Sequence, residues 1–338
     1  MNRKVLTCIC LAMLWVAPPA GLHAWRWYYD RKVSNFKALA ELYVYPGMGP
    51  EAVADTLAGK GVVKNAGSLR RAFRKEKGIV RPGHYTIGPE CSSMYAARMI
   101  SRGWQTPVNL VLAGSLRTRG GIASKVAAQM MMDSVQVASA MADSALLAGF
   151  GATPETVFTL FMPDTYQMYW TDGMDKVFAK QKEAVDAYWS ESNLAKAEKL
   201  GLSRLQVTTL ASIVKGETNF VPEMPSVAGV YLNRLRKGMK LQADPTVAWC
   251  FDYKLNRILN VHLKYDSPYN TYLHAGLPPA PICVPPREAL DAVLNPDTHS
   301  YLYFCASPDF NGTHRFAKTY PEHLANARAF QKALNNRK

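Results

Sequence analysis

The first pattern along the chain is an apolar stretch at residues 5–24 that contains no Asp, Glu, Lys or Arg. At helical rise it is long enough to cross the hydrocarbon core of a bilayer. Two basic residues precede it and an aromatic group that includes Trp25 and Trp27 follows it, as is typical of a spanning helix whose remaining chain faces outward. We therefore predict that residues 1–29 form a retained membrane anchor. A signal peptide, cleaved after the Pro- and Gly-containing end of the stretch, is the alternative.

Short apolar runs, Gly-rich turns and helical stripes then alternate in three strand-turn-helix units. The predicted strands lie at 42–45, 84–87 and 108–112, and the helix that follows each lies at 50–57, 94–100 and 122–132. The first two units match at an offset of 42 residues, which aligns Leu57 with Met99 and Gly61 with Gly103. Internal repetition and the ordinary alternation of an α+β protein explain this match equally well.

Helical periodicity dominates the second half of the chain. The elements predicted there are one or two amphipathic surface helices at 175–200, a helix capped by Ser203, a loop-rich segment from Ala243 onward, a strand at 301–305 and a final helix at 321–334. Strands and helices mixed in this way predict an α+β fold.

Composition and charge narrow the possible partners. The chain has 338 residues, of which 48% are hydrophobic and 20% charged, enough apolar residues to bury a sizeable core. Its net charge of +14 favours a polyanionic partner such as nucleic acid, anionic lipid or an acidic polymer. However, the basic run at 70–77 contains only Phe73 as an aromatic residue, and no zinc-finger or RNP-type motif occurs. We therefore expect no nucleic-acid partner and interpret the run as a solvated helix face.

Four cysteines lie beyond the apolar stretch, namely Cys91, Cys250, Cys283 and Cys305. They are widely spaced and none belongs to a C-x-x-C pair, so no disulfide can be assigned. Burial of each as a small hydrophobic residue explains them equally well.

Glu217 is the candidate catalytic residue. It lies three residues after Val214 and seven after Leu210, so on a helix it continues the buried stripe. Burial raises the pKa of a carboxyl group, and a raised pKa lets a carboxylic acid donate a proton near neutral pH. The alternative is a structural Glu, either capping or ion-paired, at a helix C-terminus, where the helix dipole disfavours a charged carboxylate.

The residues after Glu217 are rich in amides, hydroxyls and aromatic rings. Such groups suit a carbohydrate, because sugars present both hydroxyl edges and apolar faces. Ordinary Asx and proline turns explain any single one of them equally well. The candidate substrate-binding residues in this stretch are Asn233, Arg234, Gln242, Asp244, Tyr269, Asn270, Thr271 and Tyr272.

A series of short sequence blocks runs in order through the exported part of the chain. They are PDTY at 163–166, LASIVKGET at 210–218, VAGV at 227–230, NRL at 233–235, LQADPT at 241–246, YNTY at 269–272, GLPP at 276–279, YLYF at 301–304, and His314 with Phe316, Thr319 and His323. Together these blocks resemble the YceG-like endolytic murein transglycosylases (MltG family). One departure is Lys215, which stands where members of that family often carry a second Glu.

The resemblance implies an α+β protein with an N-terminal membrane segment (1–29), a small LysM-like strand-helix region (35–115) and a mixed α+β catalytic domain (116–338). It implies an enzyme that cuts nascent glycan strands of peptidoglycan, with Glu217 as the catalytic residue and His314 in the substrate-binding set. No cofactor or metal is implied. The implied location is the inner membrane, crossed once, with the bulk of the chain in the periplasm, and peptidoglycan synthases are candidate partners.

The predicted reaction uses one carboxyl group twice. Glu217 protonates the oxygen between MurNAc and GlcNAc and then deprotonates the MurNAc C6 hydroxyl, which attacks C1 and leaves a 1,6-anhydro end. Three alternatives stay open. One is a non-catalytic peptidoglycan-binding scaffold, and a second is a hydrolytic muramidase with Asp244 as the second carboxylate. The third is a zinc hydrolase built from His262, His274, His299, His314 and His323, although these histidines show no known ligand spacing.

Overall fold

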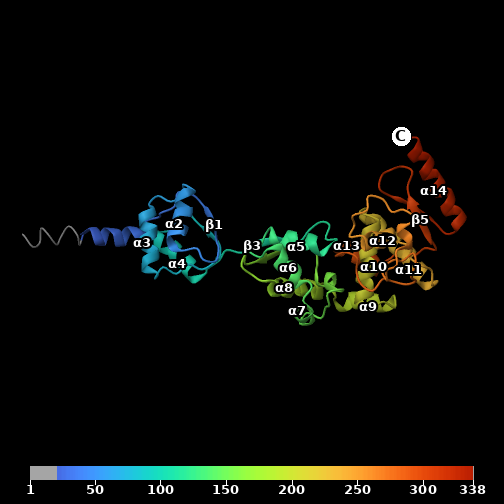
Figure 1. Ribbon diagram of the computed structural model, residues 1–338, viewed down its shortest axis with the longest axis horizontal. Helices are drawn as coiled ribbons and strands as arrows, with labels where there is room; N and C mark the ends of the chain where they lie inside the picture. Colours follow the sequence, from blue (N-terminus) through green and yellow to red (C-terminus); the bar gives the residue numbers. More distant parts are fainter. Residues whose placement is uncertain (1–20, 338) are drawn as a thin grey trace, which may run out of the picture. The chain divides into compact units, whose positions relative to one another are not determined.

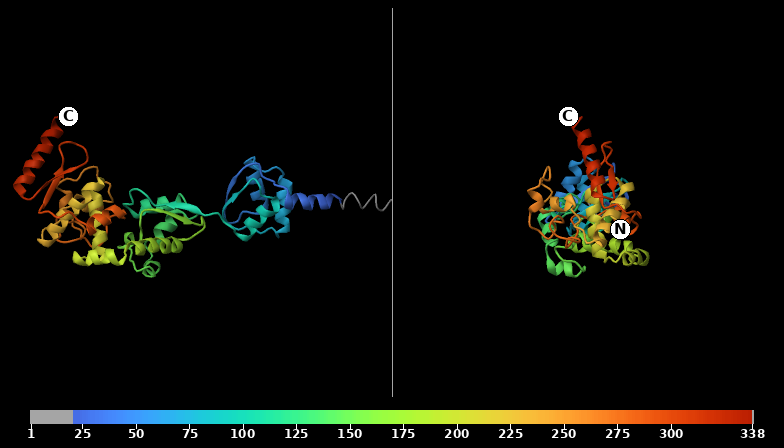
Figure 2. Two further views of the ribbon diagram at one scale, coloured as in Figure 1. Left: turned by 180° about the vertical axis from the view of Figure 1, so that it is seen from behind. Right: turned by 90° about the vertical axis from the view of Figure 1, so that its right-hand side faces the viewer.

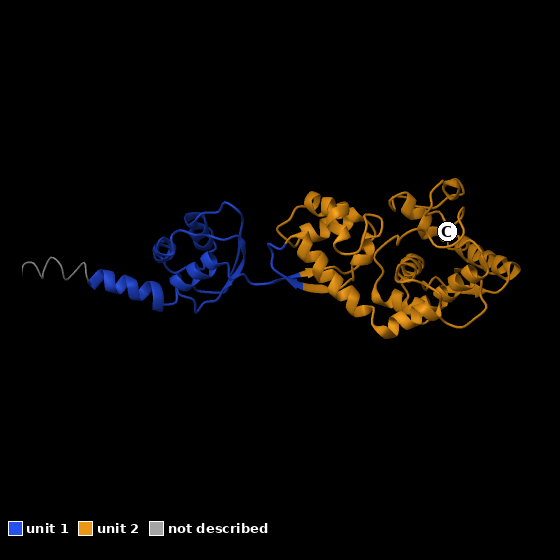
Figure 3. Ribbon diagram, turned by 90° about the horizontal axis from the view of Figure 1, so that it is seen from below, with its two compact units in different colours: residues 1–109, 167–172 blue, residues 110–166, 173–338 orange. Residues whose placement is uncertain are grey.

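The computed structural model describes residues 21–337, and the chain divides into two compact units, which Figure 3 colours separately. Unit 1 comprises Met1–Asn109 and Gln167–Asp172, and unit 2 comprises Leu110–Tyr166 and Gly173–Lys338. Most of the predicted anchor falls outside the described residues, and its described part, residues 21–29, lies in a helix that continues to residue 32. Among the residues described, no helix combines the length and the apolar character that a membrane crossing requires.

After the helix at residues 21–32, the main body of unit 1 contains two strands and three helices of ten residues each. They are β1 (Ala40–Val44), α2 (Pro50–Gly59), α3 (Ala66–Lys75), β2 (Gly83–Ile87) and α4 (Ser93–Arg102). The two strands pair antiparallel, with Ala40 opposite Ile87 and Val44 opposite Gly83. The predicted strands at 42–45 and 84–87 and the helices that follow them are therefore present (Figure 1). Whether this region is LysM-like stays a prediction.

The core of unit 1 follows from the alternation of side chains along β1. Ala40, Leu42 and Val44 are buried while the residues between them are exposed, because successive side chains of a strand point to opposite faces. The buried set packs with Leu57 of α2 and Phe73 of α3 in one hydrophobic cluster. One sheet face and the apolar stripes of the helices thus supply the core.

The basic run at 70–77 falls on α3 and on the turn after it, and one of its residues is not the solvated residue expected from the sequence. The guanidinium of Arg71 donates to both carboxylate oxygens of Asp30, at 2.6 and 3.1 Å, and Asp30 is only 1% exposed. Burial alone would raise the pKa of Asp30, but the hydrogen bonds from Arg71 and Ser68 lower it. Part of the positive charge in this run therefore balances a buried carboxylate.

The remaining elements before the site are two short strands and four helices. They are β3 (Val108–Val111), α5 (Arg119–Ala127), α6 (Ser134–Ala140), α7 (Ser144–Ala148), β4 (Thr165–Met168) and α8 (Met174–Tyr188). The chain changes from one unit to the other within β3 and β4, which form a two-stranded sheet. The helix predicted at 122–132 is observed as α5, which begins earlier and ends at Ala127.

The part of unit 2 that carries the site is mostly helical. Its elements are α9 (Glu191–Lys199), α10 (Arg204–Glu217), α11 (Met224–Arg236), α12 (Asp244–Cys250), α13 (Arg287–Leu294), β5 (Tyr303–Ala306), β6 (His314–Ala317) and α14 (Tyr320–Asn335), with short 3-10 helices at Val157–Leu160, Val221–Glu223 and His262–Lys264. The helix α10 packs against α11, α12 and α13. The strands β5 and β6 form an antiparallel hairpin along which α14 lies (Figure 2).

The central helix α10 begins where the sequence predicted. The Ser203 hydroxyl accepts a hydrogen bond from the Gln206 amide, and the Gln206 side chain accepts one from the Ser203 amide, which completes a capping box. The apolar stripe that includes Leu210 and Val214 is fully buried. These contacts hold α10 firmly from its first turn to its last, where Glu217 lies. The mixture of helices and small sheets confirms the predicted α+β class. In the described part of the chain, the four cysteines Cys91, Cys250, Cys283 and Cys305 form no disulfide bonds and are free thiols.

Candidate active site

Glu217 is the last residue of α10, and its carboxyl group lies at the edge of the core. The phenol of Tyr231, from α11, donates a hydrogen bond of 2.5 Å to Glu217 Oε1. Tyr231 is 1% exposed, and a buried phenol requires a polar partner. The buried stripe of α10 therefore ends in a carboxyl group that a second buried side chain holds in one orientation.

The surroundings of Glu217 change its acidity. Burial raises its pKa from the ordinary 4.5 to about 7, because desolvation disfavours the charged form. The hydrogen bond from Tyr231 lowers this pKa, the negative charge of Asp244 raises it, and the positive charge of Arg234 lowers it. Since burial dominates, Glu217 can exist in both protonation states near neutral pH, as a group that both donates and accepts a proton must.

Close packing brings a second carboxylate to the same place. A Cβ atom at Gly216 would lie 2.5 Å from Cβ of Pro245, so only glycine allows the last turn of α10 to approach the first turn of α12 this closely. Asp244 precedes that proline, and its Oδ1 accepts a hydrogen bond of 2.6 Å from the phenol of Tyr272. Asp244 is exposed, in contrast to Glu217. The two carboxyl groups thus lie in different environments, which suits different roles.

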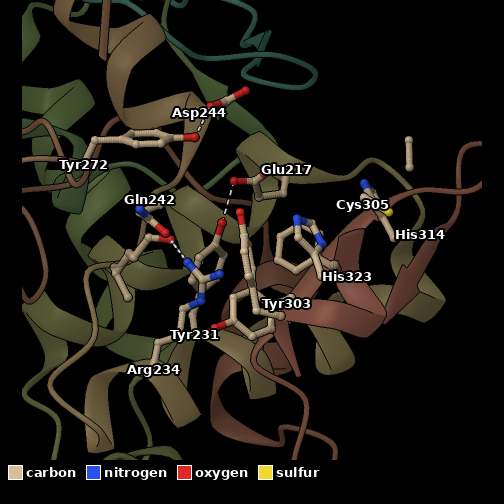
Figure 4. A pocket seen from close by; sticks show the side chains of 14 residues that line it. Glu217, Tyr231, Arg234, Gln242, Asp244, Tyr272, Tyr303, Cys305, His314 and His323 are labelled. Atoms are coloured by element: carbon tan, nitrogen blue, oxygen red, sulfur yellow. Dashed lines mark hydrogen bonds between the residues drawn. The ribbon is translucent and has the colours of Figure 1, made fainter. Parts of the chain in front are cut away.

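Both carboxyl groups line one cavity of about 450 Å³. In Figure 4, the Asp244–Tyr272 pair lies on one side of Glu217, and His323, His314 and Cys305 lie on the other. The lining residues come from α10, α11, α12, the hairpin, α14 and the loops around them: Glu217, Tyr231, Arg234, Leu241, Gln242, Asp244, Tyr272, Tyr303, Phe304, Cys305, Ala306, His314, Tyr320 and His323. We call this space the polar cavity.

Arg234 connects three parts of the polar cavity. Its Nε donates to the Leu302 carbonyl at 2.6 Å, and its Nη1 donates to the Leu241 carbonyl at 2.7 Å. Its guanidinium also lies 5.2 Å from the centre of the Tyr303 ring, within the range of a cation–π contact. Arg234 is 8% exposed, so it holds the chain before the hairpin and the chain before α12 against α11 while it contributes a positive charge beside Glu217.

Of the block at 269–272, only Tyr272 reaches the polar cavity. Thr271 is buried, and its hydroxyl accepts a hydrogen bond of 2.9 Å from the Ala243 amide. Asn270 is also buried, and its amide donates to the carbonyls of Leu263 and Tyr265. Tyr269 packs its ring against Trp249. Asn270 and Thr271 therefore fix the backbone that presents Tyr272.

Asn233 lies outside the lining of the polar cavity. Its side-chain amide donates to the carbonyl oxygens of His299 at 2.8 Å and Tyr301 at 3.1 Å. These two bonds attach the segment before β5 to α11. Asn233 therefore supports the hairpin beside the site and does not line the polar cavity. The candidate substrate-binding residues that do line the cavity are Arg234, Gln242, Asp244, Tyr272 and His314.

His314 brings in a residue that the sequence did not single out. Glu223, which is 8% exposed, accepts a 2.7 Å hydrogen bond from Nδ1 of His314 on Oε2 and a 2.8 Å bond from the His314 amide on Oε1. Both oxygens of a buried carboxylate thus hold one histidine at the wall of the cavity. Because Glu223 lies in a short 3-10 helix distant from His314 in sequence, no local pattern indicated the pair.

Tyr231 was not singled out from the sequence, and Tyr303 and His323 belonged to the sequence blocks without being candidate substrate-binding residues. Tyr231 lies on the apolar stripe of α11, so its position in the sequence is typical of a core residue. Its hydroxyl group nevertheless indicated a hydrogen-bond partner nearby, because buried phenols normally have one. The rings of Tyr303, from β5, and His323, from α14, stack with their centres 5.4 Å apart.

Lys215, the departure from the family pattern, donates to Asn219 and does not line the cavity. No group of three or more His, Cys, Asp or Glu side chains within residues 21–337 is placed to hold a metal ion.

Comparison with known proteins supports the sequence blocks. Residues 42–329 match the model of the YceG-like family. The endolytic murein transglycosylase of Bacillus subtilis (strain 168) is 39% identical over 149 residues, which are 44% of this chain and 39% of that protein. The endolytic murein transglycosylase of Streptococcus pneumoniae serotype 2 (strain D39) is 28% identical over 138 residues, 39% of this chain and 24% of that protein. The matched part of the chain therefore spans well under half the length of these two relatives.

A solved structure is similar over more of the chain. The crystal structure of a YceG-like protein from Listeria monocytogenes aligns with a TM-score of 0.59 and 26% sequence identity. The alignment covers 86% of this chain and 99% of that one. The similarity thus extends well beyond the segment around Glu217.

Proposed function

We propose that this chain, which belongs to the YceG-like family as its sequence blocks predicted, is a lytic transglycosylase that cleaves the glycan strands of peptidoglycan. One observation carries the proposal: Glu217, with its pKa raised to about 7, is held by Tyr231 at the wall of a cavity lined with hydroxyl, carboxylate, guanidinium and imidazole groups. The names of the two relatives support the same substrate class.

In the first step, the protonated Glu217 donates its proton to the oxygen that links MurNAc C1 to GlcNAc. The C1–O bond breaks, the GlcNAc hydroxyl leaves, and positive charge develops at C1 and the ring oxygen. Burial raises the pKa of Glu217 to about 7, so a large share of the group carries its proton near neutral pH, and the charge of Asp244 favours the same protonated form. The carboxylate of Asp244, in the same cavity, also favours the positive charge on the sugar.

In the second step, the Glu217 carboxylate removes the proton from the C6 hydroxyl of the same MurNAc. The C6 oxygen attacks C1, and the new bond closes a 1,6-anhydro ring. Glu217 ends the cycle protonated, so the enzyme returns to its starting state without water as a reactant. The Tyr231 hydrogen bond stabilises the carboxylate between the two steps and so supports the change of role.

The finer biological role is part of the proposal. The substrate is a nascent strand, the cut falls within it, and strand length during wall synthesis is limited as a result. We place the protein in the inner membrane, anchored by residues 1–29, with the remainder in the periplasm and peptidoglycan synthases as partners. Membrane fractionation, together with mass spectrometry of the mature N-terminus, tests the anchor against a cleaved signal peptide.

Product analysis tests the chemistry. Purified glycan strands are digested with the wild-type protein and with Glu217→Gln, and the new ends are identified by mass spectrometry. We expect 1,6-anhydro ends from the wild type and no turnover from the variant. Reducing ends would contradict the transglycosylase assignment, and turnover by Glu217→Gln would contradict the role of Glu217.

A hydrolytic muramidase is the second candidate, because Asp244 lines the same cavity and its charge acts on Glu217. In that reaction Asp244 would serve as the second carboxylate, either activating water or forming a bond to the sugar. The appearance of reducing ends, with oxygen from labelled water incorporated at C1, would favour it. A non-catalytic scaffold would instead bind glycan strands without producing any new ends.

A further inference from the structure

A second cavity also has Glu217 in its wall. It has a volume of about 600 Å³ and shares Glu217, Ala306 and His314 with the polar cavity. Its remaining lining residues are Thr218, Asn219, Phe220, Ser307, Phe310, Asn311, Gly312, Thr313 and Phe330. We call it the aromatic cavity, because three phenylalanines are among these residues. Because the two cavities share Glu217 in their walls, a ligand that occupies both of them lies against this carboxyl group.

The aromatic cavity differs from the polar cavity in its chemistry. Phe310 packs against Phe330 with a ring separation of 5.6 Å, and the Arg337 guanidinium lies 4.0 Å from the centre of the Phe310 ring. Phe220, three residues beyond the end of the catalytic helix, is 45% exposed. Phe220 therefore presents apolar surface in the cavity that Glu217 also lines, while Arg337 lies over one face of the Phe310 ring.

The hairpin loop holds Phe310 in an unusual backbone conformation. Its φ of +53° lies in the left-handed region, which residues with a Cβ rarely adopt. The loop around it is closed by the Ser307 amide, which donates to the Thr313 carbonyl at 2.8 Å, and by the Ser307 hydroxyl, which donates to Asp309 at 2.7 Å. A phenylalanine in such a conformation beside a reaction centre indicates that its ring position matters, because strain of this kind persists mainly at functional sites.

We propose that the aromatic cavity binds the N-acetylated sugar on the far side of the scissile bond, with Phe310 and Phe220 packed against its apolar faces. This inference rests on the proposed function and deepens it. Aromatic rings suit the apolar face of a pyranose and the methyl of an acetamido group, and Asn219 and Asn311 offer amides to the polar part. Because the two cavities share Glu217 in their walls, a strand that fills both of them continues in each direction from the cut bond.

Binding without turnover tests the proposal. A peptide-free glycan oligosaccharide of four sugars is titrated by calorimetry into Glu217→Gln protein that carries a second substitution. We expect Phe310→Ala and Phe220→Ala each to weaken binding roughly 3- to 10-fold, in line with the contribution of one aromatic contact. The matched control is Tyr265→Ala, because Tyr265 is 46% exposed, close to the 45% of Phe220, and lines neither cavity. We expect the control to bind as the parent does.

Two further variants separate stacking from a structural role of Phe310. Phe310→Tyr keeps the flat ring and is expected to keep the affinity, whereas Phe310→Leu keeps apolar bulk without the ring face and is expected to bind as weakly as Phe310→Ala. Unchanged binding in both alanine variants would overturn the proposal, and so would an equal loss in Tyr265→Ala. The proposed chemistry is judged separately, from the turnover of the single variant Glu217→Gln, so the failure of one proposal is distinguishable from the failure of the other.

Discussion

Replacing Glu217 by Gln should stabilise the protein above neutral pH while abolishing its activity. The carboxyl group has a pKa of about 7 in the folded chain against the ordinary 4.5, and each pKa unit corresponds to about 1.36 kcal/mol. Folding is therefore opposed by up to about 3 kcal/mol at a pH where Glu217 must be ionised. Glutamine has nearly the same shape and carries no charge, and its amide oxygen can still accept the hydrogen bond from Tyr231.

The direction of the pH dependence follows from the raised pKa. Below about pH 4.5, the carboxyl group is protonated in both the folded and the unfolded chain, so ionisation costs nothing. As the pH rises from 4.5 through 7, the unfolded chain releases the proton first, and the wild type loses stability relative to Glu217→Gln. Above pH 7 the difference is constant. The variant should thus gain up to about 3 kcal/mol over the wild type between pH 4 and pH 8.

Urea denaturation of the two proteins in the same buffers, from pH 4 to pH 8, measures this difference. The comparison isolates position 217, because every other titrating group is common to both proteins. A difference in unfolding free energy that stays the same across the range would refute the reasoning, since it would mean that the pKa of Glu217 is not raised by folding. Loss of turnover by the variant, measured on glycan strands, completes the test, because a stabilising substitution that removes activity is expected at a catalytic group that folding desolvates.

Three more substitutions test the surroundings of Glu217. Tyr231→Phe removes the hydrogen bond that lowers the pKa of Glu217, so the pH at which kcat/KM falls on the alkaline side should move upward, with activity roughly 10-fold lower; an unmoved pH profile would contradict this. Asp244→Asn removes the charge that raises the same pKa, so that limb should move downward, whereas complete loss of turnover at every pH would favour the hydrolytic reaction. Glu223→Gln should lower the free energy of unfolding by roughly 1–3 kcal/mol and lower kcat as well, because His314 loses a buried carboxylate partner. An unchanged melting temperature in calorimetry would show that the Glu223–His314 pair does not stabilise the fold.

Much of the local structure was predictable from short-range pattern. The capped start of α10, its buried stripe, and the position of Glu217 at the end of that stripe all depend on residues three or four positions apart. The strands and helices of unit 1 were predictable for the same reason. The roles of the amide side chains were harder to assign from the sequence. Asn233 and Asn270 belong to a residue type that is common in sugar-binding sites, but in the fold their side chains donate hydrogen bonds to backbone carbonyl groups. An amide donor suits a sugar and an unpaired carbonyl equally well, so composition alone does not distinguish the two.

The chain order therefore sufficed to place a half-buried carboxyl group at a helix end, since the helical spacing that continues the buried stripe is a local property. It did not suffice to identify what surrounds that group. The approach of Gly216 to Pro245, the phenol of Tyr231 on Glu217, and the Glu223–His314 pair all join segments that are separate in sequence. Such contacts depend on how the helices and the hairpin pack against one another. The spacing of apolar residues along the chain is compatible with several ways of packing these elements, and only one of them fills the interior without gaps or clashes.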